Sequence, residues 1–370
     1  MRLKSTLTIL CVAWAARSSA WAQGRSQAAG ALQASNILNP NISVVGWFQG
    51  EAGRRRPGAE EPPAFQFKEA EIAFQSVVDP YAKAELFVAV DPPEGKVDLE
   101  EGYLTWFNLP YGLALKAGKF KGNFGKFNRV HRPETAFADR PLAHEAHFGE
   151  EGLAGAGGSL SWHVPNPWLF VNLDAEALTM PGADESPAFD KAGKKDLLYI
   201  GRVHGYYDLT ESANLTLGGS YGRGAAGQAF DEASHSSSTL ASEIYGADLT
   251  FRWKNPRRAI YRSLFWQTEV FWNRRDLDLR TSAGSMGLFS HLEVQFARRW
   301  RIGGRYDWTE SPADDARHDS GGLVYLTFTP SEFSLITLQG RRVESFDGTK
   351  ETIGFLKVTF NIGPHGAHPF

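Results

Sequence analysis

Residues 169–177 read LFVNLDAEA, in which every second side chain is apolar and Asn172, Asp174 and Glu176 stand between them. Successive side chains of a β-strand point to opposite faces, so one face of this segment is apolar and the other acidic. An α-helix would need apolar residues three and four positions apart, whereas here the period is two. The segment is therefore predicted to be a strand between an apolar and an aqueous environment.

The same alternation recurs along the chain, for example in AKAELFVAV (82–90) and in LKVTFNI (356–362), where Lys357 faces the polar side. Runs of about 9 to 11 residues suit a tilted strand that crosses a membrane. Sixteen strands are expected, near 42–50, 65–78, 82–91, 96–108, 111–123, 151–164, 168–179, 197–210, 213–223, 241–254, 261–273, 286–297, 299–309, 321–329, 333–344 and 350–362.

The connections between these strands alternate between two kinds. One kind is short and turn-like, as at Asp79-Pro80 and Pro165-Asn166-Pro167. A membrane barrel has short turns at one rim and longer loops at the other, whereas a soluble sandwich has no reason to alternate in this way. The fold class predicted is an all-β, antiparallel, up-and-down transmembrane β-barrel of about 16 strands. The other kind is mostly long and charged, at 51–64, 92–95, 124–150, 180–196, 224–240, 274–285, 310–320 and 345–349.

The composition agrees with an exported barrel. The chain has 11 Trp, 25 Phe and 38 Gly, yet no run of 18 apolar residues that would form a membrane-spanning helix. Its net charge of −3 argues against a nucleic-acid partner. Several aromatic residues lie near predicted strand ends, as interface girdles do, including Trp162, Trp168, Trp266, Trp272 and Trp300.

The first residues have the three parts of a secretory signal. Arg2 and Lys4 precede the apolar stretch 7–16, and Ala20-Trp21-Ala22 offers a cleavage site. Residues 1–22 are therefore expected to be a signal peptide and residues 23–40 a flexible periplasmic lead-in. The only cysteine, Cys11, lies within the signal, so the mature chain has no disulfide and no thiolate metal site.

Three stretches carry a resemblance to a known family: FKEAEIAFQSVVDPYAKAELFVA (67–89), LEEGYLTWFNLPYGLALKAGKFKGNFGKFN (99–128) and FNIGPHGAHPF (360–370). With the predicted architecture, they make the chain resemble the Gram-negative outer-membrane porin superfamily, and more loosely its phosphate-selective branch. The resemblance implies passive diffusion of small hydrophilic solutes or ions through a barrel at 41–362. It also implies a cell outer-membrane location, contact with outer-membrane lipid and a homotrimer.

The family presents a C-terminal Phe to the barrel-assembly machinery, and this sequence ends at Phe370. One departure concerns the last strand, where Gly363-Pro364 interrupts the alternation and Pro364 has no N–H to donate. The last strand is therefore expected to end near Ile362, followed by a tail at 363–370.

The resemblance also implies a loop after the fifth strand that folds into the barrel and narrows it. The longest predicted connection, 124–150, stands at that position and is rich in charge. Such a loop selects solutes by size and by local field. The constriction residues expected from it are Lys126, Arg129, His131, Arg132, Glu134, Asp139, Arg140, His144, Glu145 and His147.

A basic stripe on the pore wall is a further hypothesis. The inward positions of the strand near residue 300 and of neighbouring strands would supply Arg299, Arg301, Arg305, Lys116, Arg202 and Arg252. Predicted inward acids such as Glu69, Glu269 and Asp174 nearly balance these cations. Anion and cation preference therefore both stay open, and phosphate transport does not follow.

Other classes of function have weaker support in the sequence than a channel. The pair His144 and His147 could ligate a metal, but polar loop histidines explain the spacing, so no metal and no other cofactor is expected. An outer-membrane hydrolase is the less favoured alternative, and it would need a nucleophile at a defined rim beside a pair such as His204 and Asp208. A barrel that serves as an adhesin or structural protein is the remaining alternative.

Overall fold

The computed structural model describes residues 40–59, 63–182, 185–231, 235–256, 261–312 and 314–363. The expected signal peptide at 1–22, nearly all of the lead-in at 23–40, and the tail from Pro364 to Phe370 lie outside these residues.

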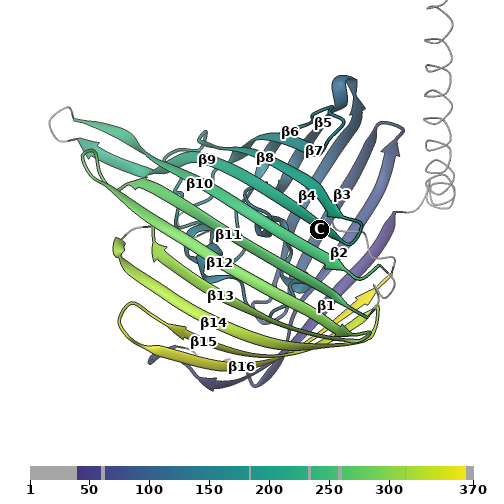
Figure 1. Cartoon of the computed structure of the whole chain (residues 1–370). Helices are drawn as coiled ribbons and strands as arrows, with labels where there is room; N and C mark the ends of the chain where they lie inside the picture. Colours follow the sequence, from purple (N-terminus) through teal and green to yellow (C-terminus); the bar gives the residue numbers. More distant parts are fainter. Residues whose placement is uncertain are drawn as a thin grey trace, which may run out of the picture.

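Sixteen antiparallel strands form one closed barrel in which each strand pairs with its neighbours in sequence and β1 pairs with β16 (Figure 1). The predicted fold class is thus confirmed. The strands are β1 (Asn41–Arg54), β2 (Phe65–Asp79), β3 (Ala82–Asp91), β4 (Lys96–Leu109), β5 (Leu113–Lys121), β6 (Ala154–His163), β7 (Phe170–Thr179), β8 (Leu197–Thr210), β9 (Ala213–Asp231), β10 (Ser236–Lys254), β11 (Ser263–Asp276), β12 (Ser282–Ala297), β13 (Trp300–Ser311), β14 (Asp314–Ser331), β15 (Ser334–Glu344) and β16 (Lys350–Ile362).

Among the described residues, helical structure is limited to short pieces. Three of them lie between β5 and β6, namely η2 (Phe127–Arg129), η3 (Arg132–Glu134) and α2 (Leu142–Phe148), while η1 (Pro110–Gly112) makes a turn. Within the described part of the chain, no helix combines the length and apolarity needed to span a bilayer.

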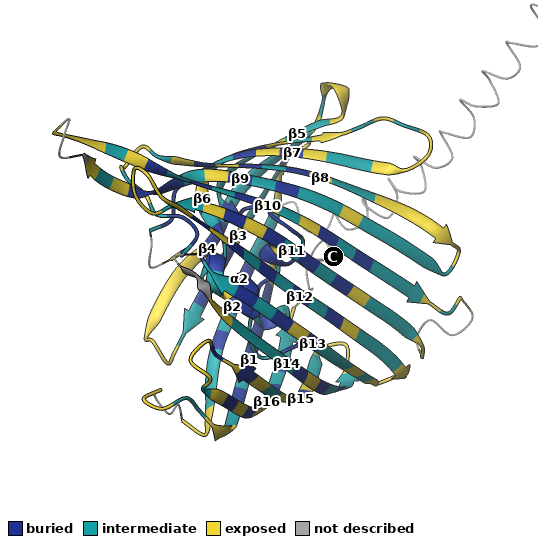
Figure 2. Ribbon diagram, turned by 60° about the vertical axis from the view of Figure 1, so that its left-hand side comes forward, coloured by how far each residue is buried: buried dark blue, intermediate teal, exposed yellow. Residues whose placement is uncertain are grey.

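The two faces of the wall follow the alternation expected from the sequence. On β7, Asp174 and Glu176 are buried inside the barrel while Leu173 is exposed outside. On β16, Lys357 and Thr359 are buried inside and Leu356 is exposed. Figure 2 shows the resulting bands of buried and exposed residues along the strands. The outward aromatic residues expected at strand ends are exposed at Trp162, Trp168, Trp266, Trp272 and Trp300.

Three of the connections expected to be long are mostly strand. Residues 224–231 and 236–240 extend β9 and β10, and the ranges 274–285 and 310–320 are largely taken up by β11 to β14. The charged composition of these stretches is typical of loops, but cross-strand pairing continues through them, as between Ser236 and Asp231. The difference in length between the two kinds of connection is therefore smaller than predicted.

Two register shifts change which side chains face the lumen. Between β1 and β2 the register shifts at Trp47/Phe48, and between β3 and β4 it shifts at Phe87/Val88. A β-bulge puts two residues opposite one and re-aims a side chain. On β2 the consecutive residues Lys68 and Glu69 accordingly both turn inward, as Glu100 and Glu101 do on β4.

Candidate functional site

The chain between β5 and β6, residues 122–153, is called the lumen segment here because it contacts the inner face of the wall on opposite sides. Its His131 contacts β4, and its Phe127 backbone contacts β11. In a closed ring of sixteen strands, β4 and β11 are seven positions apart, so they face each other across the barrel. The lumen segment therefore crosses the interior, where Figure 2 shows α2.

Glu269 of β11 fixes the start of the lumen segment. Its Oε1 accepts hydrogen bonds from the backbone N–H groups of Lys126 (2.9 Å) and Phe127 (2.7 Å), and its Oε2 lies 3.0 Å from His144 Nε2. Gly125 has a φ of +61°, and a Cβ there would lie 2.4 Å from Glu269 Oε2. Both the backbone conformation and the close approach require glycine at this position.

Asp139 fixes the middle of the lumen segment. Its Oδ2 lies 2.7 Å from Arg305 Nη2 and 3.3 Å from Arg341 Nη1, and Gln339 Nε2 donates to Oδ1 at 2.6 Å. Burial alone would raise the pKa of Asp139, but the guanidinium groups of Arg305 and Arg341 outweigh it and hold this pKa below its usual range. Asp139 is thus a charged anchor between the segment and strands β13 and β15.

Lys357 of β16 binds the lumen segment through its backbone. Its buried ammonium donates to the carbonyl oxygens of Arg132 (3.2 Å), Thr135 (3.0 Å) and Phe137 (3.3 Å). It also lies 4.8 Å from the ring centroid of Trp47. The ammonium thus supplies hydrogen bonds to three backbone carbonyl groups of the lumen segment, which no strand pairs with at this point.

Aromatic side chains also hold the lumen segment against the wall. Phe124 and Phe148 of the segment pack on Phe271 of β11, with ring centroids 6.3 Å and 5.2 Å away. Phe127 packs in the same way on Phe289 of β12 at 5.5 Å. Part of the inner wall is therefore apolar, because these inward positions face the segment and are removed from water.

His131 lies among three carboxylates of the wall. Its Nδ1 is 2.6 Å from both Glu71 Oε2 and Glu100 Oε2, and its Nε2 is 2.7 Å from Glu101 Oε1. Burial and Lys121 oppose a charge on the ring, but these carboxylates outweigh them and raise the pKa of His131 well above its usual value. Both carboxylates of β4 reach the ring because of the bulge at Glu100.

His144 and His147 of α2 do not meet as a pair of metal ligands. His144 Nε2 faces Glu269, whereas His147 Nε2 lies 3.1 Å from Ser285 Oγ and its Nδ1 lies 3.1 Å from the carbonyl oxygen of Ala143. Both rings are fully buried. Burial lowers the pKa of His144, and it lowers that of His147 to about 4, so both rings are neutral at pH 7.

Acidification from pH 7 to pH 4 is expected to weaken the docking of α2. His147 of a released α2 would titrate near 6.5, so the released state takes up a proton at a higher pH than the docked state. The free energy that holds α2 docked is therefore complete above pH 6.5 and falls as the pH drops to about 4. The shift corresponds to about 3 kcal/mol. A dye on an E145C variant should report the release. Adding H147Q should flatten much of this transition, and an unchanged profile would contradict the role of His147.

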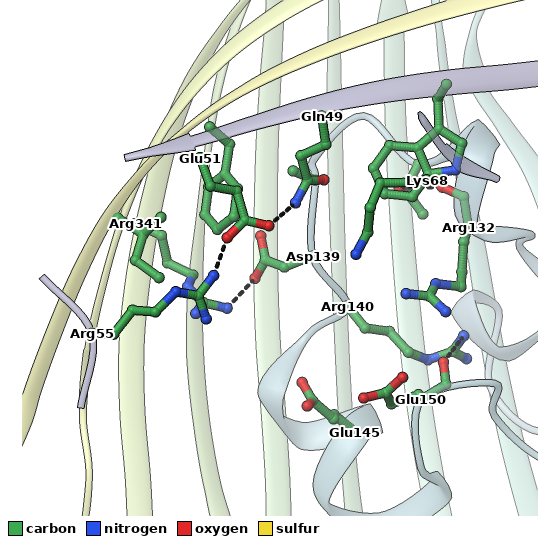
Figure 3. Close-up of a pocket in the computed structure, with 15 residues that line it drawn as sticks. Gln49, Glu51, Arg55, Lys68, Arg132, Asp139, Arg140, Glu145, Glu150 and Arg341 are labelled. Carbon is green, nitrogen blue, oxygen red and sulfur yellow. Dashed lines mark hydrogen bonds and ion pairs between the residues drawn. The ribbon is translucent and has the colours of Figure 1, made fainter. Parts of the chain in front are cut away.

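A cavity of about 190 Å³ remains between the lumen segment and strands β1, β2, β15 and β16 (Figure 3). Arg132, Asp139, Arg140 and Glu145 of the predicted constriction residues line it. Lys126, Arg129 and Glu134 are not part of its lining, and the three histidines take part in docking. The lining also includes Glu150, another acid of the predicted loop, and charged residues that the sequence reasoning missed: Glu51, Arg55, Lys68 and Arg341.

Lys68 was missed because simple alternation cannot show a bulge. The acidic and basic groups of the lining are partly paired, as Glu51 is with Arg55 and Asp139 with Arg341 (Figure 3). Lys68 and Arg140 approach the same space as Glu145 (Figure 3). The cavity thus presents opposite charges to any solute within it.

The basic stripe expected on the wall does not form. Arg299 lies exposed in the turn before β13, because that strand begins at Trp300. Arg305 is buried between Asp139 and Asp307.

The remaining wall cations are also accompanied by other groups. Arg202 pairs with Asp248 at 2.8 Å, and Arg301 lies 3.8 Å from Glu293. Lys116 and Arg252 lie over the aromatic rings of Tyr103 and Phe265. The pair considered for a hydrolase is likewise divided, since His204 lies 3.6 Å from Asp174 while Asp208 accepts from Tyr206.

The closed ring of sixteen strands gives this chain the fold of the 16-stranded Gram-negative outer-membrane porins. Among solved structures, OprB of Pseudomonas putida aligns over 88% of this chain and 94% of its own, with a TM-score of 0.58 and 10% identity. The anion-selective porin of Comamonas acidovorans aligns over 88% and 100%, with a TM-score of 0.58 and 8% identity. The outer-membrane channel DcaP of Acinetobacter baumannii aligns over 88% and 96%, with a TM-score of 0.55 and 11% identity.

In sequence, the chain is similar to an uncharacterized protein of Aquifex aeolicus, with 29% identity over 364 residues that cover 89% of this chain and 75% of that protein. The chain matches no protein-family model.

Proposed function

We propose that this protein is an outer-membrane channel for the passive diffusion of small hydrophilic solutes or ions. The observation that carries the proposal is the charged cavity between the lumen segment and the wall. A 16-stranded barrel encloses an aqueous lumen, and a segment docked across it sets the size and the field of the remaining passage. The porin fold of the neighbouring structures supports the same conclusion.

The lumen segment would act as the constriction of this channel. Its docking contacts involve buried ion pairs, hydrogen bonds and aromatic packing on β2, β4, β11, β13, β15 and β16. Such contacts hold irregular backbone in one position, which a size-selective passage needs. Within the passage, Lys68 and Arg140 would oppose Glu145 and Glu150 and would orient solutes that carry a dipole.

The outer surface supports a place in the outer membrane. Apolar side chains alternate outward on the strands, with exposed residues such as Leu173 and Leu356, and exposed Trp residues lie near strand ends. We further propose export through the N-terminal signal, assembly through the C-terminal region and a homotrimeric state, as the resemblance to porins implies. A cross-linking experiment on the detergent-solubilised protein would test the trimer.

Recording of the purified protein in a planar lipid bilayer would test the channel. Discrete conductance steps that scale with salt concentration are expected, because ions cross a water-filled passage. A folded protein that inserts into the bilayer and conducts no ions would overturn the proposal and would favour a structural or adhesive barrel. Circular dichroism on the same preparation shows whether the barrel is folded.

Neutralising the cations of the cavity in a K68Q/R140Q double variant is expected to shift ion preference towards cations. Removal of two positive charges at a narrow point changes the ratio of cation to anion permeability by about two- to threefold. The reversal potential in a KCl gradient measures this ratio. The matched E145Q variant should shift the reversal potential in the opposite direction. An unchanged reversal potential in both variants would show that the charges of the cavity do not face the passage.

A further inference from the structure

The side chains around His131 form a closed polar cluster between the lumen segment and strands β2 and β4. The exposed fractions of the His131 and Glu71 side chains are 2% and 1%, and that of Glu100 is 7%. One atom from each of these side chains, with His131 supplying Nδ1, lies within 4.8 Å of the other two. A set of one imidazole and two carboxylates at this spacing is the donor set of a transition-metal site.

The hydrogen bonds within the cluster leave one carboxylate oxygen without a donor. Glu71 Oε2 and Glu100 Oε2 both lie 2.6 Å from the same Nδ1, which carries at most one hydrogen. Among the described residues, Glu71 Oε2 has no hydrogen-bond partner. A buried carboxylate oxygen in this state costs free energy unless another positive species binds it. Glu71 Oε2 and Glu100 Oε2 therefore both face His131 Nδ1.

Glu101 prepares the imidazole ring for a metal. Its Oε1 lies 2.7 Å from His131 Nε2, and its Oε2 accepts the backbone N–H of Lys121 at 3.0 Å. A carboxylate that accepts the Nε2–H proton fixes the tautomer whose Nδ1 lone pair is available to a metal. The lone pair would then face Glu71 and Glu100, the two carboxylates that supply the other ligand atoms.

A divalent ion would balance the charge of the cluster. Glu71, Glu100 and Glu101 contribute three negative charges, and Lys121, whose Nζ lies 3.6 Å from Glu100 Oε2, contributes one positive charge. With a neutral imidazole, the net charge of these groups is −2. A bound proton on His131 leaves the cluster at −1, whereas a divalent cation brings it to zero. Buried charge is most stable when it is fully compensated.

We propose that Glu71, Glu100 and His131 form a binding site for a divalent transition-metal ion, with Zn²⁺ the best match, which ties the lumen segment to strands β2 and β4. Ca²⁺ needs six to eight oxygen ligands and Mg²⁺ retains several waters, and a closed cluster of this size suits neither. Zinc bonds of about 2.0 to 2.2 Å in a tetrahedron place ligand atoms about 3.4 Å apart. Shifts of less than about 1 Å from the 2.6 Å contacts would therefore accommodate the ion.

Metal binding would fix the position of the lumen segment from the side opposite to Glu269. His131 lies in the segment, whereas Glu71 and Glu100 lie in the wall, so the ion would join the two. Any effect on conductance rests on the proposed channel function. The metal site itself does not, because its stoichiometry can be measured on protein in detergent.

The test is zinc uptake by the full-length folded protein after removal of metal with EDTA. Equilibrium dialysis against ZnCl₂ followed by elemental analysis is expected to give about one tightly bound zinc ion per chain. E71Q, which is nearly isosteric, and H131Q should each lose this ion. E101Q should retain it with about 10- to 100-fold weaker affinity, because the orienting carboxylate is lost. Circular dichroism identifies any variant that fails to fold.

Two control variants keep this test specific. H204Q removes another wall histidine that lies beside a carboxylate, Asp174, and should leave zinc uptake unchanged. H365Q/H368Q removes the histidines of the tail and should also leave it unchanged. The proposal is overturned if the wild-type protein takes up no zinc, if folded H131Q and E71Q retain it, or if the tail variant loses it. Absence of zinc from the wild-type protein would leave a proton as the occupant of the cluster.

Discussion

Replacement of residues 127–148 by a short glycine-serine linker is expected to raise the single-channel conductance several-fold. These residues include η2, η3 and α2, which occupy the interior between β4 and β11. Without them, the ions would cross a wide aqueous lumen instead of the narrow cavity beside Lys68. Planar-bilayer recording in a fixed KCl concentration measures the change, and the closed hydrogen-bonded ring of strands should still form.

The matched control for this deletion is a linker of the same kind at 277–281, the connection between β11 and β12. It leaves the lumen segment in place, so its conductance should equal that of the wild-type protein. An unchanged conductance in a folded 127–148 variant would show that the ions do not pass beside the segment. The constriction role would then be wrong even if the protein is a channel.

The D139A variant is expected to release the lumen segment from β13 and β15. Removing one partner of a buried ion pair costs about 3–5 kcal/mol, because the remaining charge stays buried without its partner. Here Arg305 and Arg341 would lose the carboxylate that both contact. If trypsin cleaves the open segment, a cost of about 3 kcal/mol raises the cleavage rate by about a hundredfold. Mass spectrometry of the fragments should place the cuts after Lys126 and Arg129, because proline follows both Arg132 and Arg140 and blocks trypsin there.

Two further variants make the D139A result interpretable. D139N keeps an oxygen that can accept the hydrogen bond from Gln339 but loses the charge, so its cleavage rate should lie between those of D139A and the wild type. E145Q changes an exposed acid of α2 and should cleave like the wild type. Equal resistance of D139A and the wild type would show that the aromatic contacts alone hold the segment.

Much of the fold could be predicted because a strand that separates an apolar from an aqueous medium must alternate with a period of two. That rule located all sixteen strands and gave the end of β16 at Ile362, but it made several of them too short, such as β9 and β14. The rule gave the wrong face for side chains near a shift in strand register. The inward turn of Lys68 and the pairing of Glu100 and Glu101 with His131 depend on bulges, which shift the alternation by one residue without a sequence signal strong enough to locate them.

The charged residues of the candidate site likewise could be predicted only in part from the sequence. Arg305 was correctly assigned to the inner face of its strand, but its charge is neutralised by Asp139, which is 166 residues away in sequence. Likewise, the inward Phe271 and Phe289 are stable at lumen positions only because Phe124 and Phe127 cover them. Such pairings depend on how a long segment folds back, and neighbouring residues in the sequence carry no information about them.

The sequence by itself determined the barrel, the number of its strands and the polarity of most wall positions, because these follow from local alternation and chain length. It also singled out 124–150 as charged and unusually long. Only the tertiary structure decided which charged side chains of that segment bind the wall and which line the cavity. The physical reason is that an ion's partner is set by distance in space, and the contacts of Asp139, His131 and Lys357 all join parts of the chain that are far apart in sequence.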